Sequence, residues 1–472
     1  MVKVIVKWNK NVYKDIEIDD FKTGADLKKK LQELTNVPVD RQKVMGLGGL
    51  LKDDQILSDL KIKIGQTVQL LGSADSLPEP PKEKTVFAED VTGNEESLGF
   101  YPNGLVNLGN TCYLNAAVQT LKVVPELRTA LKEYTPPSSG NDLEQKITAS
   151  LRDTFKDLDD NGKNSVTPDR FLQAFRSAYP QFAEKSRTEF GEIYAQQDAD
   201  EFISKLLFSI GPKLQVTESS SSDQKKSITD KLFSGQFQVS IKNTESAEEP
   251  IKTEQEGFHK LSCYINQQTS NLNYGLEQSM QETIEKNSPT LNRNALYMKT
   301  SKISKLPPYL LVNFVRFEWK NRDKTKAKIL RDVKFPTTLD VYDYCTDDYK
   351  KTLDVTREAL RKQKEEAILK KKSDVVEPEE KKMKMDVDVQ SVSLLEGDDT
   401  AWYELSAVIT HKGRTSNSGH YVGWVKDDNK RWLKYDDDEV SEVSQEEVKK
   451  LSGGGDWHTA YLLLYKRMNE AP

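Results

Sequence analysis

The chain has 472 residues, a length that suggests two or three folded units. Lys and Arg number 69 against 75 Asp and Glu, so the formal net charge is −6 and there is no overall basic field. This charge argues against nucleic acid or an anionic membrane as the main partner. No apolar stretch is long enough for integral membrane association.

The three cysteines are Cys112, Cys263 and Cys345, which lie far apart and form no CxxC pair. They are too few for a disulfide framework or a four-ligand zinc site, so we expect no metal and no other cofactor. The first residues, MVKVIVKW, alternate and lack the apolar core of a signal peptide. The cytoplasm, and also the nucleus, is therefore the expected location.

Residues 1–74 are predicted to form a small domain with the element order of the ubiquitin-like β-grasp. Thr23 and Asp26 form a capping-box pattern ahead of an amphipathic helix. Alternating or short apolar runs predict strands on both sides of this helix, at residues 2–6, 12–18, 44–51 and 67–71. A ferredoxin-like unit shares much of this pattern, and a purely structural duty is the alternative. The unit has no terminal Gly-Gly pair, which indicates a docking module and not a transferable modifier.

Residues 75–99 are rich in proline and acid, as is typical of a linker. The larger remaining part, residues 100–468, is predicted to be a second α+β domain. Two polar segments inside it, residues 217–228 and 346–400, are predicted to be mobile insertions, because core patterns resume after each. Part of the second segment is expected to be a solvated helix between Thr352 and Lys372.

Cys112 is the strongest candidate for a nucleophile. Apolar residues recur at helical spacing after it, so a helix is predicted to begin close to the cysteine, with Asn110 or Thr111 as a side-chain N-cap. A thiol in the first turn lies near the positive end of the helix dipole, which favours the nucleophilic thiolate. A buried structural cysteine is the alternative, and it is the expected state of Cys263 and Cys345.

His420 is the strongest candidate for the base, because it follows a Ser/Gly loop and opens an alternating strand. The other histidines lack an evident orienting neighbour or could simply pack: His259, His411 and His458. If the next turn pairs Lys426 with Arg431, Asp436 falls opposite residue 421, and a one-residue bulge or a different turn length would align it with His420. Such a carboxylate would fix the tautomer of the imidazole, although a structural His–Asp pair is the alternative.

Several long motifs resemble those of the ubiquitin-specific protease family. GLVNLGNTCYLN resembles its cysteine box, and SGHYVGWVK with WLKYDDDEV resembles its histidine box. QQDADEF, LPPYLLVNFVRF and AYLLLYK match further motifs in the family's order. The resemblance covers residues 100–467. It implies a papain-like finger–palm–thumb fold and cleavage of peptide or isopeptide bonds after the C-terminal glycine of ubiquitin. Many members carry a four-cysteine zinc site in the fingers; this chain lacks those ligands, so its fingers must hold without metal.

The resemblance assigns Cys112 as the nucleophile, His420 as the general base and Asp436 as the residue that orients the histidine. The two aspartates that follow Asp436 are local competitors for this role. Asn107 matches the asparagine whose amide donates to the tetrahedral oxyanion. Locally, a loop asparagine in a left-handed turn would give the same pattern.

QQDADEF contributes the substrate-binding candidates Gln196, Asp198 and Glu201. Asp198 and Glu201 are expected on one face of a helix, where they could line the channel for the arginine-bearing tail of ubiquitin. The alternative is that they are solvated acids at a helix start, complementing its dipole.

A ubiquitin-like unit directly ahead of such a domain narrows the resemblance to proteasome-associated members. It implies a deubiquitinase that trims or recycles ubiquitin from polyubiquitinated proteins and binds the 26S proteasome regulatory particle through its N-terminal domain. A catalytically silent ubiquitin-binding scaffold is the main alternative, and acyl transfer to an amine is a weaker one. Two polar loops, residues 319–328 and 411–418, are expected to cover the cleft until docking opens it; ordinary surface loops are the alternative.

Overall fold

The computed structural model describes two compact units of the chain, Met1–Leu98 and Gly99–Pro472, each of which is treated by itself below. The described residues are 3–71 and 101–470, without residues 9–10, 19–20, 36, 40–41, 48, 61, 64, 138–141, 161–164, 189–190, 217–225, 321–324, 374–398, 416–417 and 456. The predicted linker, residues 75–99, lies outside this description. No helix in the described ranges is long and apolar enough to cross a membrane.

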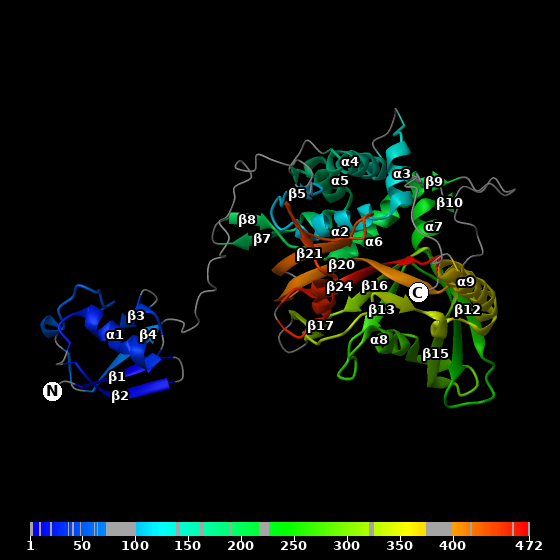
Figure 1. The fold of residues 1–472 in the computed structure, drawn as a ribbon. Helices are drawn as coiled ribbons and strands as arrows, with labels where there is room; N and C mark the ends of the chain where they lie inside the picture. Colours follow the sequence, from blue (N-terminus) through cyan, green and yellow to red (C-terminus); the bar gives the residue numbers. More distant parts are fainter. Residues whose placement is uncertain are drawn as a thin grey trace. The chain divides into compact units, whose positions relative to one another are not determined.

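The N-terminal unit is a four-stranded sheet packed against one helix (Figure 1). The strand order is β2-β1-β4-β3, with β1 and β4 parallel in the centre. Its elements are β1 (Lys3–Trp8), β2 (Asn11–Glu17), α1 (Gly24–Thr35), β3 (Lys43–Met45), the 3-10 helix η2 (Leu57–Asp59) and β4 (Gln66–Leu71). Alternate residues of β1, Val4 and Val6, are fully buried with Leu27 and Leu31 of α1, which explains the sequence pattern.

The predicted capping box at the start of α1 is confirmed. The backbone N–H of Thr23 donates to Asp26 Oδ2 at 3.1 Å, and the N–H of Asp26 donates to Thr23 Oγ1 at 3.4 Å. The predicted strand at 44–51 is shorter than expected, because Gly46 adopts φ 106° and turns the chain directly after β3.

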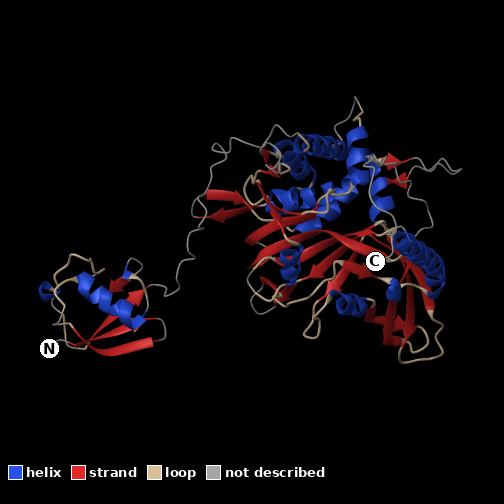
Figure 2. Ribbon diagram, in the orientation of Figure 1, coloured by secondary structure: helices blue, strands red, loops and turns tan. Residues whose placement is uncertain are grey.

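The larger unit is built around a ten-stranded sheet, drawn in red in Figure 2. Its main path is β13 (Lys260–Tyr264), β16 (Tyr309–Val315), β24 (Thr459–Arg467), β20 (Trp402–Thr415), β21 (Ser418–Lys426), β22 (Trp432–Asp436) and β23 (Glu439–Val443), and it is joined by β17 (Phe317–Lys320), β18 (Thr325–Lys328) and β19 (Thr338–Asp340). Successive residues of β16 enter two different cores: Tyr309 and Leu311 face one, and Leu310 and Val312 face the other. A sheet buried on both faces explains why LPPYLLVNFVRF is almost continuously apolar.

Helices and short strands lie on the side of the first of these faces, and the helices pack against it (Figure 1). They are β5 (Gly104–Leu105), α2 (Cys112–Lys122), α3 (Pro125–Glu133), α4 (Leu143–Leu158), β6 (Ser165–Val166), α5 (Asp169–Ala178), η4 (Pro180–Ala183), β7 (Lys185–Thr188), β8 (Gly191–Tyr194), α6 (Ala199–Ile210), η5 (Gly211–Lys213), β9 (Gln215–Val216), β10 (Lys226–Ser227) and α7 (Ile228–Phe233). Helix α2 crosses strand β21 where Gly423 leaves room: a Cβ there would lie 3.3 Å from the carbonyl oxygen of Ala116. This close approach brings the start of α2 to the strand that holds His420.

The other face is lined by helices and 3-10 helices. They are α8 (Leu272–Ser279), η6 (Tyr342–Tyr344), α9 (Asp347–Ser373), α10 (Gln445–Lys449) and η7 (Lys450–Ser452). Helix α9 begins at Asp347, five residues before the predicted start at Thr352. Its first part is packed against the domain, because Leu353 is fully buried and the Arg357 Nε donates to the carbonyl oxygen of Thr400 at 2.7 Å. The mobile insertion predicted at 346–400 is therefore wrong for this first part, and residues 374–398 lie outside the description.

The other predicted insertion, residues 217–228, is also shorter than expected. Lys226 and Ser227 form strand β10, and Ile228 begins helix α7. The Ser227 side chain caps that helix by accepting from the N–H of Asp230 at 3.4 Å. The remaining residues, 217–225, lie outside the description.

The two loops expected to cover the cleft are largely strands. Residues 319–320 and 325–328 belong to the hairpin of β17 and β18, and His411 is a fully buried residue of β20. Gly413, with φ 135°, lies in an irregularity of the β20–β21 ladder before Thr415 pairs with Ser418. The loop prediction is therefore wrong for the described residues of both segments, because the two strand ladders continue through their polar sequence.

The fingers are a separate four-stranded sheet in the order β12-β11-β15-β14. Their strands are β11 (Gly235–Asn243), β12 (Lys252–Phe258), β14 (Gln281–Ser288) and β15 (Arg293–Lys305). Two glutamates join the β11–β12 loop to the β14–β15 hairpin. Glu245 accepts from Arg293 and from the N–H of Leu296, both at 2.7 Å; Glu249 accepts from Ser288 and, at 2.6 Å, from the hydroxyl of Tyr297. Carboxylate hydrogen bonds thus hold the tip of the fingers together.

Glu249→Gln is expected to lower the melting temperature at neutral pH. Hydrogen bonds from Ser288 and Tyr297 lower the pKa of Glu249 from about 4.5 to about 2. A carboxylate with a lowered pKa stabilises the fold above its unfolded pKa, and this contribution disappears as the pH falls from 4.5 towards 2. Melting curves between pH 7 and pH 3 should therefore show native and variant converging in acid. Glu248→Gln, at an exposed neighbour, is the control; an equal effect of both changes would contradict the assignment.

Candidate active site

Cys112 is the first residue of α2, and its side chain is almost completely buried. The preceding turn is held by Thr111, whose hydroxyl accepts from the N–H of Leu108 at 2.8 Å and donates to Asn107 Oδ1 at 3.2 Å. Thr111 is the N-cap residue, but its side chain makes no capping hydrogen bond; the predicted side-chain cap is therefore wrong there. The thiol still lies in the first turn, at the positive end of the helix dipole, as predicted.

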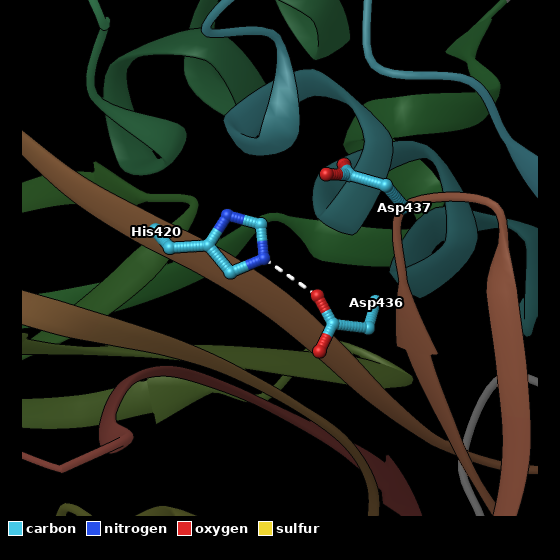
Figure 3. A group of neighbouring side chains, drawn as sticks. All are labelled: His420, Asp436 and Asp437. Atoms are coloured by element: carbon cyan, nitrogen blue, oxygen red, sulfur yellow. Dashed lines mark hydrogen bonds and ion pairs between the residues drawn. The ribbon is translucent and has the colours of Figure 1, made fainter. Parts of the chain in front are cut away.

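His420 and Asp436 lie on neighbouring strands and are joined by a hydrogen bond of 2.6 Å between His420 Nε2 and Asp436 Oδ1 (Figure 3). The register differs by one residue from the prediction, because Lys426 pairs with Trp432 and not with Arg431. Continuing this ladder places Asp436 opposite Val422, so that Asp436 and His420 are diagonal neighbours on one face of the sheet. The predicted pair is therefore brought together without a bulge.

The electrostatics of His420 favour the imidazolium. The hydrogen bond to Asp436 is the largest cause that raises the pKa of His420 from 6.5 to about 10, and the neighbouring Cys112 side chain is the next. The same hydrogen bond to His420, followed by one from Lys434, lowers the pKa of Asp436 well below its usual value. A cation beside a thiol, held by a carboxylate on its other side, is an arrangement that can serve a nucleophile and carry its proton.

Asp436→Asn is expected to shift the alkaline limb of the pH–rate profile to lower pH. The Asp436 hydrogen bond is the largest cause of the raised pKa of His420, so removing its charge lowers that pKa. In the native chain the imidazolium persists until the pH approaches 10, whereas in the variant it should deprotonate earlier. Its activity should fall less than on loss of the thiol, because an amide can still orient the ring. Profiles between pH 6 and 10.5 on a fluorogenic ubiquitin amide test this. Asp438→Asn, on an exposed neighbour, should leave the limb in place.

Asn107 is fixed at both ends of its amide group. Its Oδ1 accepts from the N–H groups of Gly109 and Thr111 at 3.0 and 3.2 Å. Its Nδ2 donates to Asp437 Oδ2 at 2.9 Å, which leaves the second amide hydrogen for another acceptor. Asp437 is thus hydrogen-bonded to Asn107, and Figure 3 marks no hydrogen bond or ion pair between Asp437 and His420.

The substrate-binding candidates lie in three different environments. Asp198 is the N-cap of α6: it accepts from the N–H groups of Asp200 and Glu201 at 2.8 and 3.2 Å, and from the hydroxyl of Tyr461 at 2.6 Å. The prediction that it shares a helix face with Glu201 is wrong, because it precedes the helix. Glu201 is exposed in the first turn, and Gln196 is buried with no hydrogen-bond partner for its Nε2 among the described residues.

The remaining histidines have structural surroundings. Burial lowers the pKa of His411 to about 3 and that of His458 to about 4, so both are neutral near pH 7. His458 packs edge-to-face beside His420, with ring centres 6.4 Å apart. His259 does have a partner that the sequence did not indicate: Asp230 Oδ1 lies 2.9 Å from its Nε2.

One group in the described part of the chain could offer three metal ligands: His420, Asp436 and Asp437. Its carboxylates already accept hydrogen bonds from His420, Lys434, Asn107 and Asn115. These contacts account for the cluster without a metal ion.

Two hydrogen-bond partners of the candidate site residues were not identified from the sequence. Asn115 lies one helical turn after Cys112, and its Nδ2 donates to Asp437 Oδ1 at 2.8 Å. Tyr461, in the closing strand, is the partner of Asp198. The spacing of Asn115 from Cys112 was a usable signal, because residues three apart share a helix face; no local signal pointed to Tyr461.

The site and its setting define a class: a cysteine protease whose thiol lies on a helix beside a sheet that supplies a His–Asp pair. The sequence pattern of the ubiquitin carboxyl-terminal hydrolase family matches residues 103–465, and that of the ubiquitin family matches residues 2–75. The chain therefore belongs to the ubiquitin carboxyl-terminal hydrolase family and carries an N-terminal ubiquitin-like domain, as predicted.

Individual relatives match over nearly their whole length. Ubiquitin carboxyl-terminal hydrolase 6 of Arabidopsis thaliana is 40% identical over 489 residues, covering 99% of each chain. Ubiquitin carboxyl-terminal hydrolase 14 of Caenorhabditis elegans is 35% identical over 475 residues, covering 98% of this chain and 93% of its own.

Solved structures show the same fold. Ubp8 in the SAGA DUB module bound to ubiquitin aldehyde aligns with a TM-score of 0.53 at 21% identity, covering 78% of this chain and 69% of the other. The predicted α+β architecture with a ubiquitin-specific protease domain is thereby confirmed.

Proposed function

We propose that the chain hydrolyses the peptide or isopeptide bond after the C-terminal glycine of ubiquitin, with Cys112 as nucleophile, His420 as general base and acid, and Asp436 as its orienting residue. The observation that supports this most is the 2.6 Å hydrogen bond between Asp436 and His420, together with the part that the Cys112 side chain has in raising the pKa of His420. A catalytically silent scaffold would not need an imidazolium between a carboxylate and a thiol in order to bind ubiquitin.

In the first half of the reaction, the Cys112 thiolate attacks the carbonyl carbon of the ubiquitin glycine and forms a C–S bond. The carbonyl electron pair moves to oxygen, where the second Asn107 amide hydrogen stabilises the oxyanion; such a donor contributes about 3 kcal/mol. When the oxyanion collapses, the C–N bond breaks and the His420 imidazolium gives its proton to the departing amine. A thioester between ubiquitin and Cys112 remains.

In the second half, the now neutral His420 takes a proton from water, and the water oxygen attacks the thioester carbon. Collapse of this second oxyanion breaks the C–S bond and releases ubiquitin with a free carboxyl group. The Cys112 thiolate and the His420 imidazolium are restored. Because water supplies the attacking oxygen, the net reaction is hydrolysis and not acyl transfer to an amine.

For the substrate tail, we propose contacts to Glu201 and Gln196. The exposed carboxylate of Glu201 suits an arginine of the tail, and the unbonded Nε2 of Gln196 can donate to a backbone carbonyl. Asp198 is better suited to hold the start of α6, since its oxygens already have three donors.

The decisive experiment is reaction with ubiquitin that carries a C-terminal electrophile. A hydrolase should form a single covalent adduct, mapped by mass spectrometry to Cys112. A silent scaffold would bind ubiquitin without forming any adduct, and an adduct on Cys263 or Cys345 would overturn the assignment of the nucleophile.

The N-terminal domain is proposed to dock the enzyme on the regulatory particle of the 26S proteasome, so that ubiquitin is trimmed or recycled from polyubiquitinated proteins in the cytoplasm and the nucleus. Its sheet offers exposed apolar side chains at β3 and β4, where Met45 and Leu71 are 46% and 45% exposed, and at Leu50, which is bridged to Met45 and is 55% exposed. Exposed apolar side chains on a small domain favour a protein partner.

Replacing Met45 and Leu71 together by serine is expected to weaken binding in co-sedimentation with purified proteasomes about 5- to 30-fold, since two exposed apolar contacts contribute on the order of 1–2 kcal/mol. Hydrolysis of a small fluorogenic ubiquitin amide should not change. Val12→Ser, on the opposite edge strand, is the control for loss of an exposed apolar residue. Unchanged co-sedimentation, also after deletion of residues 1–75, would refute docking through this domain.

A further inference from the structure

The turn that follows Asp436 contacts both other parts of the active site. β22 ends at Asp436 and β23 begins at Glu439, so residues 437 and 438 form a two-residue turn. The backbone carbonyl of Asp437 accepts from the N–H of Leu105 at 2.9 Å. A Cβ on Gly104 would lie 2.5 Å from the Cα of Asp438, so only glycine allows this approach. The turn is therefore seated on strand β5, just ahead of the loop that holds Asn107.

The side chain of Asp437 completes this connection. Its carboxylate is buried, with 9% of the residue exposed, and it accepts from Asn107 Nδ2 at 2.9 Å and from Asn115 Nδ2 at 2.8 Å. Asn115 lies on the same helix as the nucleophile, three residues after Cys112. Asp437 also adopts φ 58°, a left-handed conformation that costs a non-glycine residue free energy. One side chain thus links the orienting turn, the oxyanion asparagine and the nucleophile helix.

We propose that Asp437 is a positioning residue that acts through Asn107. The Asn107 carbonyl oxygen is occupied by Gly109 and Thr111, and one hydrogen of its Nδ2 by Asp437, so the amide plane has a single orientation. The remaining hydrogen is then directed in advance towards the developing oxyanion. Preorganised donors are effective because they need no reorientation when charge develops. Asp436 orients the imidazole of His420, whereas its neighbour Asp437 orients the amide that stabilises the oxyanion.

This proposal rests on the proposed function, and it is tested by Asp437→Asn. The variant keeps the size and tolerates the left-handed conformation, but a single amide oxygen cannot replace a carboxylate that accepts from two amides. We expect kcat for ubiquitin amide hydrolysis to fall about 10- to 100-fold with KM nearly unchanged, less than the loss of a whole oxyanion donor. Alkylation of Cys112 by iodoacetamide, which forms no oxyanion, should keep its native rate and pH profile.

Two comparisons separate this role from the alternatives. In an Asn107→Ala background, Asp437→Asn should change kcat less than twofold, because its effect passes through Asn107. Asp436→Asn should change the alkylation pH profile, which Asp437→Asn should not. A native kcat in Asp437→Asn, additive losses in the double variant, or a shifted alkylation profile would each overturn the proposal.

If Asp437→Asn does not fold, Asn115→Ala repeats the test from the other side of the carboxylate. It should also lower kcat while leaving alkylation unchanged, and a native kcat would overturn the proposal. Failure of the Asp437 proposal can be distinguished from failure of the proposed function, because the proposed function is measured on the native chain. If the native chain forms no adduct on Cys112 and shows no hydrolysis, the proposed function itself is refuted.

Discussion

Replacing Cys112 by alanine is expected to abolish hydrolysis of a fluorogenic ubiquitin amide, with a loss of at least about 10⁴-fold in kcat, as found when the nucleophile of a hydrolytic triad is removed. The loss follows because no other thiol can take over. Cys263 and Cys345 are fully buried, and desolvation raises the pKa of each thiol to about 12.

Cys345→Ser is the matched control for this change. The serine hydroxyl can replace the thiol that donates to the carbonyl oxygen of Val341 at 3.4 Å, so folding and activity should be retained. Circular dichroism and ubiquitin binding should also be native in Cys112→Ala, because the side chain is small. Residual turnover of Cys112→Ala within tenfold of native would contradict the assignment of Cys112 as the nucleophile.

Arg316→Met is expected to destabilise the larger unit by about 3–5 kcal/mol, the range for breaking a buried charged network. Arg316 is fully buried, and its guanidinium donates to four backbone carbonyls, at 2.7 Å to Ala460, 2.8 Å to Arg331, 2.9 Å to Ser452 and 3.1 Å to Ile329. Methionine fills the volume but leaves these acceptors without a donor, and each unsatisfied buried carbonyl is costly.

Urea unfolding of the full chain, followed by the fluorescence of the larger unit, measures the change. Arg128→Met is the matched control, because Arg128 forms a partly exposed ion pair with Asp428 at 3.3 Å; its loss should cost less than about 1 kcal/mol. Arg316→Lys should be intermediate, since a lysine has three donors for four acceptors. Equal midpoints for the two methionine variants would contradict the role of Arg316.

Arg316 also shows why some features could not be inferred from the sequence. In LPPYLLVNFVRF it follows an apolar strand, where an arginine ordinarily marks the surface. Its four acceptors belong to three segments that come together only in the fold, near residues 329–331, 452 and 460. No local pattern reports such an arrangement, because backbone carbonyls are the same at every position.

The misplaced cleft loops have a similar cause. Residues 411–418 are polar and contain Gly and Ser, so they were predicted to be a loop. In the structure the β20–β21 ladder extends to Thr415 and Ser418, and strand β18 joins it at Ala327. Pairing with a neighbouring strand satisfies the backbone regardless of side-chain polarity, so tertiary contacts override the local preference.

The sequence alone determined the elements whose signals are local. The capping box of α1, the alternation of β1 and the helix that begins at Cys112 all follow from short-range patterns. The long boxes around Cys112 and His420 were sufficient for the family. What they could not determine was the relation between distant segments, since hydrogen bonds across more than three hundred residues leave no periodic trace.

Only the tertiary structure decided which partner each of the neighbouring aspartates meets. In the sequence, Asp436, Asp437 and Asp438 are three equivalent carboxylates in a row. The register of β22 against β21 places Asp436 diagonal to His420, and the two-residue turn directs Asp437 towards Asn107 and leaves Asp438 exposed. Neighbouring residues of a strand and its turn point in different directions, and which side chain meets which partner depends on strand pairing that no local sequence encodes.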